Sequence, residues 1–125
     1  MLFGDAGSAS LFSKSKNTNK DQKFSFKSDG SGFDNIIIPS GISRKLNQNQ
    51  HAGVEEGKLY MNGPGVFNFT ITKVPDLITS FSKSLTQDIS DWDFILLHQP
   101  NKFIIDHIYK KIKIKENAAF SNINK

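Results

Sequence analysis

The residues with the clearest chemical potential lie at positions 98–101, where the sequence reads His-Gln-Pro-Asn. They follow the apolar run at residues 94–97, which is typical of a strand buried on both faces, as in a parallel sheet. Pro100 ends that strand because it has no N–H group, and proline is tolerated where a helix begins. The pattern predicts an imidazole and an amide at the carboxyl end of a central strand, where open α/β sheets bind ligands.

The same residues also suit an ordinary junction between a strand and a helix. Asn101 is a good N-cap residue, because its side-chain oxygen can accept hydrogen bonds from the free amides of a first helical turn. In that interpretation His98 is incidental, and the spacing alone does not separate the two possibilities.

Two amphipathic helices are predicted around this segment. The first carries one apolar stripe over more than four turns, formed by Phe67, Ile71, Val74, Ile78, Phe81 and Leu85. Pro75 lies inside this stripe and is expected to kink or break the helix near Val74. The second helix starts near Asn101, with an ion pair between Asp106 and Lys110 on its exposed side. Its predicted buried face consists of Ile105, Ile108 and Ile112.

The part of the chain before these helices predicts only short elements. Residues 3–12 indicate a glycine-interrupted strand, and residues 23–27 alternate polar and apolar types, as in a half-buried strand. Residues 40–57 are polar and are expected to form a long surface excursion. His51 lies there without a partner at the spacing of metal ligands, so we expect it to be solvated.

Composition narrows the class of protein. The 125 residues suffice for one small domain, and no apolar run approaches the roughly 20 residues that cross a bilayer. No secretory signal is visible, so the cytoplasm is the expected location. The net charge of +4 comes from lysines and the single arginine Arg44, which argues against a nucleic-acid reader and favours an acidic protein partner. The chain contains no cysteine, which excludes disulfides and thiolate–metal sites.

Three motifs occur in a fixed order along the chain. Residues 2–9 read Leu-Phe-Gly-Asp-Ala-Gly-Ser-Ala, residues 61–69 read Met-Asn-Gly-Pro-Gly-Val-Phe-Asn-Phe, and residues 98–101 read His-Gln-Pro-Asn. In this order they resemble a strand and turn, a helix opening and the His-Gln-Ala-Asn loop of β-ketoacyl-acyl carrier protein synthase III, a family of the thiolase superfamily. The resemblance implies an α/β fold, specifically a partial thiolase-like fold with a mixed sheet flanked by helices. It assigns residues 1–22 to the end of the family's N-terminal half and residues 23–125 to most of its C-terminal half, which is incomplete.

The resemblance also implies an activity, the decarboxylative condensation of an acyl thioester with malonyl-acyl carrier protein in fatty acid biosynthesis. In the family, a cysteine upstream of the first motif takes the acyl group, and an asparagine after the segment that resembles residues 119–125 supplies a second amide. Neither residue is present in this sequence. We therefore expect an internal piece of a longer enzyme, inactive by itself.

Site residues follow from the same resemblance. His98 matches the catalytic histidine that donates a hydrogen bond to the malonyl carbonyl. Asn101, Phe67 and Thr70 match positions that bind the pantetheine arm. The residues expected to dock the acidic carrier protein are Lys102, Lys110 and Lys111.

Coenzyme A and phosphopantetheine thioesters are expected as substrates, with no permanently bound cofactor and no metal. The expected partners are acyl carrier protein and acyl-coenzyme A, without nucleic acid or membrane, and the complete protein is expected to be a homodimer.

Some positions depart from the family. Pro100 replaces the usual alanine, while Asn68 and Phe103 stand where lysine and arginine are frequent, which weakens the inferred carrier-protein surface.

Two other functions remain open. One is an acyltransferase of the same fold in secondary metabolism or glycan assembly, which would keep the fold and change the acyl donor or acceptor. The other is a non-catalytic interaction module that binds an acidic protein through the lysine-rich helix.

Overall fold

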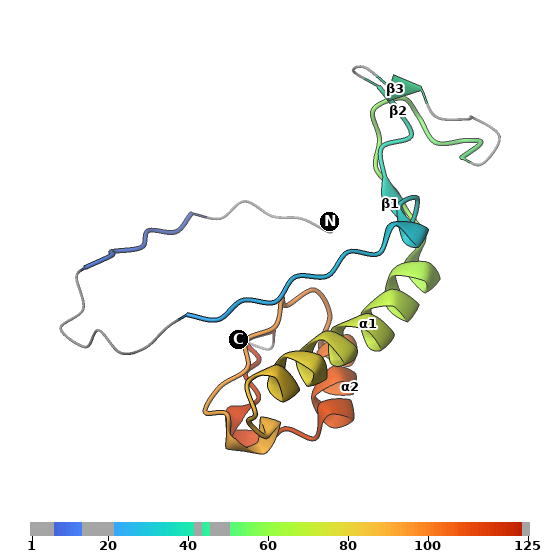
Figure 1. Cartoon of the computed structure of the whole chain (residues 1–125). Coiled ribbons are helices and arrows are strands. Elements are labelled where there is room, and N and C mark those ends of the chain that lie inside the picture. Colours follow the sequence, from blue (N-terminus) through green and yellow to red (C-terminus); the bar gives the residue numbers. More distant parts are fainter. Residues whose placement is uncertain (1–6, 14–21, 42–43, 46–50, 124–125) are drawn as a thin grey trace.

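The computed structural model describes residues 7–13, 22–41, 44–45 and 51–123, and two α-helices dominate it (Figure 1). These are α1 (Gly63–Ser84) and α2 (Lys102–Ile112). The strands are short: β1 (Ile36–Ile37), β2 (Ser40–Gly41), β3 (Arg44–Lys45) and β4 (Tyr60–Met61). Single 3₁₀ turns occur at Gly30–Gly32, Ile89–Asp91 and Glu116–Ala118.

Helix α1 begins at a well-formed cap and continues without a break. The side chain of Asn62 accepts a hydrogen bond from the amide of Gly65 at 3.2 Å, and Pro64 occupies the first turn, where a missing N–H group does no harm. The predicted interruption near Val74 is wrong in its stronger form, because α1 runs through Pro75 as one helix. Pro75 is buried, so tertiary packing overrides the local cost of a proline in a helix.

Helix α2 matches its prediction closely. The side-chain oxygen of Asn101 accepts hydrogen bonds from the amides of Phe103 and Ile104, at 2.8 and 3.4 Å. The predicted buried face is confirmed, since Ile105, Ile108 and Ile112 are all buried. The expected ion pair is wrong: Asp106 bonds to Lys102, at 2.9 Å, instead of to Lys110. Both lysines lie four residues from Asp106, so sequence spacing could not choose between them.

The hydrophobic core is small and lies where α2 meets the segments on either side of it. It consists of Ile95, Ile105, Tyr109 and Ile112, and Ile78 and Trp92 pack against it from α1 and the loop that follows it. The backbone amide of Ile95 donates to the carbonyl of Ala118 at 3.0 Å. This contact belongs to an isolated parallel bridge between Ile95 and Ala119.

The apolar run at residues 94–97 is not a strand buried on both faces, and that prediction is wrong. Ile95 is buried, but Phe94 and Leu96 are 62% and 71% exposed. Within the described residues the bridge to Ala119 is the run's one contact of strand type. Successive side chains of an extended run point to opposite faces, and only one face of this run has a neighbour, so every second side chain is exposed.

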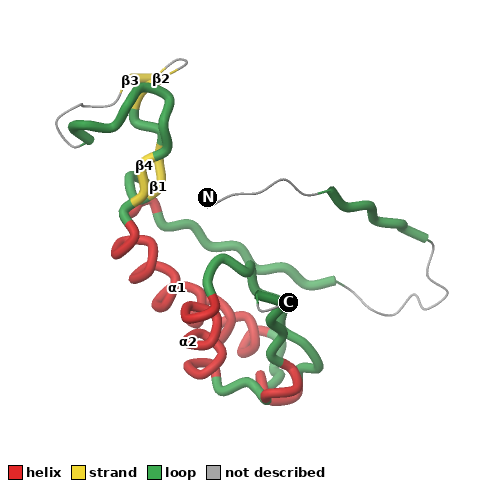
Figure 2. Tube along the Cα trace, turned by 180° about the vertical axis from the view of Figure 1, so that it is seen from behind, coloured by secondary structure: helices red, strands yellow, loops and turns green. Residues whose placement is uncertain are grey.

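The two strands predicted near the start of the chain are not seen. Of the first, predicted at residues 3–12, residues 3–6 lie outside the described residues, and residues 7–12 carry no strand. Residues 22–29 are exposed and extended, and no described strand pairs with them, so the alternation at residues 23–27 produces no sheet. Instead the segment lies along α1 (Figure 2), where Lys27 Nζ donates to Ser80 Oγ at 3.1 Å and Asp29 pairs with Lys73 at 2.9 Å.

The chain between residues 36 and 61 forms two small antiparallel sheets. In one, β1 pairs with β4 and places Ile36 opposite Met61; in the other, β2 pairs with β3. His51 is not solvated as predicted, since it is only 9% exposed and its ring lies edge-on to that of Tyr60, at 4.7 Å. The His51 Nδ1 atom has no hydrogen-bond partner among the described residues.

Helices and short strands together make a partial α/β fold, as predicted, with the strands paired in twos and one parallel bridge in the described part of the chain. No helix in the described ranges has the length and apolar character needed to span a bilayer.

The ion pair that holds residues 22–29 against α1 is expected to respond to acid. Hydrogen bonds from Ser31 and Lys73 hold the pKa of the Asp29 carboxyl well below its usual range. A depressed pKa stabilises the fold above the ordinary aspartate pKa, about 3.9, and this contribution is lost as the pH falls below that value. The exposed pair is screened by salt, so we expect a small effect.

Asp29→Asn isolates this contribution, because asparagine keeps an oxygen acceptor for the Ser31 amide and loses the charge. The variant is expected to have a lower urea midpoint than the unaltered chain at pH 7, and the difference should shrink as the pH falls from about 4 towards 2. Asp93→Asn, at an exposed aspartate without a described partner, serves as the control. A difference that persists unchanged at pH 2 would contradict the assignment.

Candidate active site

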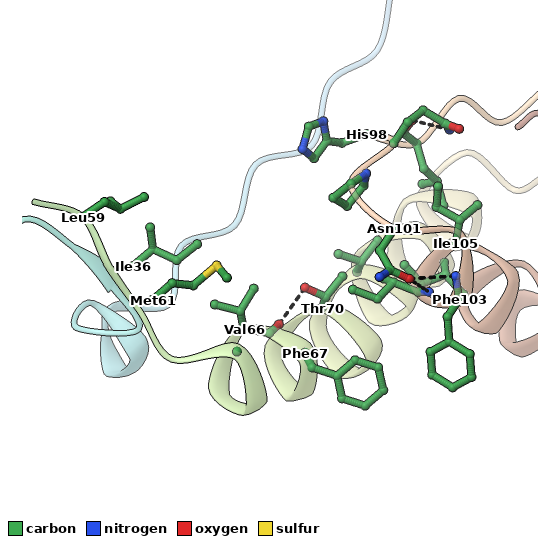
Figure 3. A pocket seen from close by; sticks show the side chains of 17 residues that line it. Ile36, Leu59, Met61, Val66, Phe67, Thr70, His98, Asn101, Phe103 and Ile105 are labelled. Carbon is green, nitrogen blue, oxygen red and sulfur yellow. Dashed lines mark hydrogen bonds between the residues drawn. The ribbon is translucent and has the colours of Figure 1, made fainter. Parts of the chain in front are cut away.

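A pocket of about 790 Å³ lies between the amino-terminal half of α1, the loop at residues 97–101 and the first turns of α2 (Figure 3). Its walls are mostly apolar. The two helices contribute Val66, Phe67 and Val74 from α1 and Ile104, Ile105 and Ile108 from α2. The remaining apolar residues are Ile36 of β1, Met61 of β4 and Leu59, which precedes β4. The pocket thus lies between the β1–β4 sheet and the helical core.

The polar side chains of the pocket are few and gather mainly on the 97–101 loop. This loop contributes His98, Gln99 and Asn101, and α1 contributes Thr70. The Thr70 hydroxyl donates to the Val66 carbonyl at 2.7 Å, so its proton is used within α1 and its oxygen remains an acceptor. A largely apolar cavity with a few convergent polar groups is the usual form of a small-molecule site.

His98 lines the pocket that also includes Gly63 at the start of α1, although the run before it is not the buried strand that the sequence predicts. Its ring is exposed, and no hydrogen bond joins it to another described residue. The imidazole is therefore held by its backbone and not by a side-chain partner. Both ring nitrogens remain available to a ligand.

Asn101 combines the two roles that the sequence left open. The side-chain oxygen of Asn101 caps α2, as described above, and Asn101 also lines the pocket. Because the oxygen is engaged, the Nδ2 donor is the group that a ligand in the pocket could use.

Phe67 and Phe103 form an aromatic pair at the edge of the pocket. Their ring centroids lie 6.0 Å apart with an interplanar angle of 21°, and Phe103 is 67% exposed. Both residues line the pocket, so the pair gives it a flat apolar rim.

Sequence reasoning did not identify Gln99 as a site residue, although it lies within the motif. Its Nε2 donates to the Leu97 carbonyl at 2.9 Å, and its Oε1 accepts from the amide of Asn122 at 3.3 Å. These bonds tie the loop that carries His98 to the segment near residue 122. Gln99 therefore shapes the site through the backbone.

Tyr109 was also missed, because nothing in its local sequence distinguishes it from other buried helix residues. Its hydroxyl lies 2.8 Å from the carbonyl oxygen of Ile95 and 2.7 Å from that of Phe120. Burial raises the pKa of the phenol, so it stays protonated and shares its single proton between the two carbonyls. Tyr109 thus holds the run leading to His98 against the segment near residue 120.

The three lysines expected to dock a carrier protein lie on α2 and do not line the pocket. Lys102 is paired with Asp106, and Lys111 Nζ donates to the carbonyl oxygen of Ile71 at 2.9 Å. Lys110 is exposed and forms no hydrogen bond or ion pair with another described side chain. No group of three potential metal ligands occurs within the described ranges.

Comparisons with known proteins identify relatives over nearly the whole chain, although no family model matches it. The chain is 31% identical to a β-ketoacyl-[acyl-carrier-protein] synthase III of Prochlorococcus marinus, across 98% of this chain and 37% of the relative. It is 33% identical to a putative 3-oxoacyl-[acyl-carrier-protein] synthase 3 of Campylobacter jejuni, across 94% of this chain and 35% of the relative. This chain is related to the β-ketoacyl-acyl carrier protein synthases III. It spans little more than a third of the length of these curated relatives.

Solved structures agree with this relationship. A crystal structure of a 3-oxoacyl-(acyl-carrier protein) synthase from Burkholderia xenovorans matches with a TM-score of 0.69 and 31% identity, over 79% of this chain and 29% of that one. A 3-oxoacyl-(acyl-carrier-protein) synthase III structure matches with a TM-score of 0.65 and 30% identity, over 78% and 32%. The predicted synthase III resemblance and partial thiolase-like α/β fold are confirmed.

Removing the Tyr109 hydroxyl should weaken the attachment of the run at residues 94–97 to the segment near residue 120. Tyr109→Phe leaves two carbonyls without their shared donor, which is expected to destabilise the chain by about 1–3 kcal/mol. Urea unfolding measures this loss. Tyr60→Phe is the matched control, since no hydrogen bond from the Tyr60 hydroxyl occurs among the described residues, and an equal loss in both variants would refute the role of Tyr109.

Proposed function

We propose that this chain is part of a 3-oxoacyl-acyl carrier protein synthase III-type enzyme, which joins an acyl thioester to malonyl-acyl carrier protein with loss of carbon dioxide in fatty acid biosynthesis. The observation that carries the proposal is the pocket. The pocket is lined by all four residues that the sequence motifs indicate as binding or catalytic, namely His98, Asn101, Phe67 and Thr70. The names of the relatives, each of them a synthase of this type, support the same reaction.

His98 is proposed as a hydrogen-bond donor in the condensation step. Loss of carbon dioxide from a malonyl thioester leaves an enolate, whose oxygen carries the developing negative charge. A fixed donor aimed at such an oxygen typically lowers the activation free energy by about 2.7–4 kcal/mol. Neutral imidazole has one N–H group for this purpose, and a ring exposed to the pocket with no competing partner leaves that group available.

The loop that carries His98 supplies the rigidity that such a donor needs. Pro100 restricts its own backbone, Gln99 ties the loop to Asn122, and Asn101 joins it to the first turn of α2. Tyr109 secures the run that leads into it. Precise placement of the imidazole is thus provided by backbone anchors, since His98 has no side-chain partner among the described residues.

The remainder of the pocket is proposed to take the pantetheine arm of coenzyme A or of the carrier protein, as substrate and not as a bound cofactor. Pantetheine is a chain of methylene and amide groups. The apolar walls suit its methylenes, while Asn101 Nδ2 and the Thr70 oxygen suit its amide oxygens and N–H groups. Phe67 lines the same wall.

The exposed side of α2 is proposed to meet the acidic carrier protein, with the complete enzyme a cytoplasmic homodimer. Lys102, Lys110 and Lys111 supply the positive charge for steering. Because Lys102 and Lys111 already bond within the chain, Lys110 is the ammonium most available to a partner.

The 125 residues are proposed to be inactive alone. The reaction needs a thiolate to hold the acyl group, and the chain contains no cysteine. We propose that residues 1–22 belong to the end of the amino-terminal half of the enzyme and residues 23–125 to its carboxyl-terminal half. The cysteine and the second amide then come from outside this sequence.

The decisive experiment replaces His98 in a protein that joins this chain to the missing parts of the enzyme. His98→Ala is expected to lower the rate of condensation of acetyl-coenzyme A with malonyl-acyl carrier protein by about 10²–10³-fold, because the enolate loses a donor. His107→Ala is the control, since His107 is exposed on α2 and outside the pocket. Unchanged turnover in His98→Ala, or condensation by the 125-residue chain alone, would reject the proposal.

A further inference from the structure

One side chain of α2 reaches across to the backbone of α1. Lys111 Nζ lies 2.9 Å from the carbonyl oxygen of Ile71, a residue 40 positions earlier in the chain. Lysine ammonium groups on exposed helices usually remain in water, so a bond to the backbone of another helix calls for a reason. The reason is found four residues after Ile71.

Pro75 occupies the position whose N–H group would donate to Ile71. In an α-helix the amide of residue i bonds to the carbonyl of residue i−4, and proline has no amide hydrogen. The Ile71 carbonyl therefore loses its regular helical donor, although α1 continues through Pro75. Lys111 supplies a donor to this particular carbonyl, and to no other backbone group among the described residues.

We propose that Lys111 is a positioning residue that replaces the hydrogen bond removed by Pro75 and thereby fixes α2 against α1. Its ammonium is a charged donor, which makes the bond to a carbonyl stronger than one between neutral groups. Its alkyl stem can cross between the helices while the head reaches the backbone. Lys111 also belongs to the last turn of α2, where the helix dipole favours positive charge.

The hydrogen bond between Lys111 and Ile71 joins segments of α1 and α2 that also carry residues of the pocket. Thr70 and Val74, on either side of Ile71 in α1, form one wall, and Ile108, three residues before Lys111, belongs to the α2 wall. Lys111 itself is not a lining residue. Its loss should therefore alter the spacing of the walls without removing any group that a ligand touches.

The linkage between Lys111 and Pro75 is tested with a double-mutant cycle in the 125-residue chain. Lys111→Met is expected to increase the equilibrium constant for unfolding by about three- to tenfold, as measured in urea. Pro75→Ala restores an N–H group at residue 75, so Lys111→Met should have little effect in that background. An equal effect of Lys111→Met in both backgrounds would overturn the linkage.

Two further variants keep the test decisive even if Pro75→Ala does not fold. Lys110→Met removes the same charge from the neighbouring residue, which bonds to no described side chain, and should leave the unfolding constant nearly unchanged. Lys111→Arg keeps a charged donor and should preserve stability. If Lys110→Met destabilises the chain as much as Lys111→Met does, the effect is one of charge and the proposal fails.

The positioning role rests on the proposed function and has its own readout, calorimetric titration with coenzyme A. Lys111→Met should weaken binding by more than Lys110→Met, and Lys111→Arg should restore it. Equal affinities in all variants would overturn the positioning role alone. Absence of binding to the unaltered chain would overturn that role together with the pantetheine site, whereas the unfolding cycle decides the linkage independently.

Discussion

The burial of one face of α2 is the constraint on which the rest of the structure depends. Ile105 is completely buried, and Tyr109 and Ile112 follow it on the same face. Around this face gather the run at residues 94–97, the segment near residue 119 and the later part of α1, through Ile78. Within the described residues the run at residues 94–97 and the segment near residue 119 share a single bridge, between Ile95 and Ala119, so the apolar contact with α2 holds them in place. The loop bearing His98 owes its position to this arrangement.

The two helices could be predicted from sequence because their information is local. The apolar stripe of α1, the cap at Asn101 and the buried face of α2 all depend on residues within a few turns of one another. The strands could not be predicted equally well, because a strand is completed by a partner that lies elsewhere. Residues 23–27 alternate correctly and yet pair with no described strand, and residues 94–97 have a neighbour on one side only.

The candidate site divides in a similar way. Ordered motifs identified His98, Asn101, Phe67 and Thr70, and the structure brings all four to one pocket. The partners that hold the site in place were not predictable, since Tyr109 and Lys111 act on carbonyl groups far along the chain. His51 shows the same limit: its sequence neighbours are polar, but its burial is due to contact with Tyr60 from the far end of a long excursion.

Ile105 belongs both to the core and to the pocket wall. Shortening this side chain to enlarge the cavity would remove core contacts, which typically costs about 2–5 kcal/mol for isoleucine to alanine. Phe103 also lines the pocket but is mostly exposed, so its replacement carries no comparable penalty. The size of the cavity can therefore be changed at Phe103 with little loss of stability, whereas a change at Ile105 would destabilise the core. A change in the size of the accepted ligand would arise through Phe103 long before it could arise through Ile105.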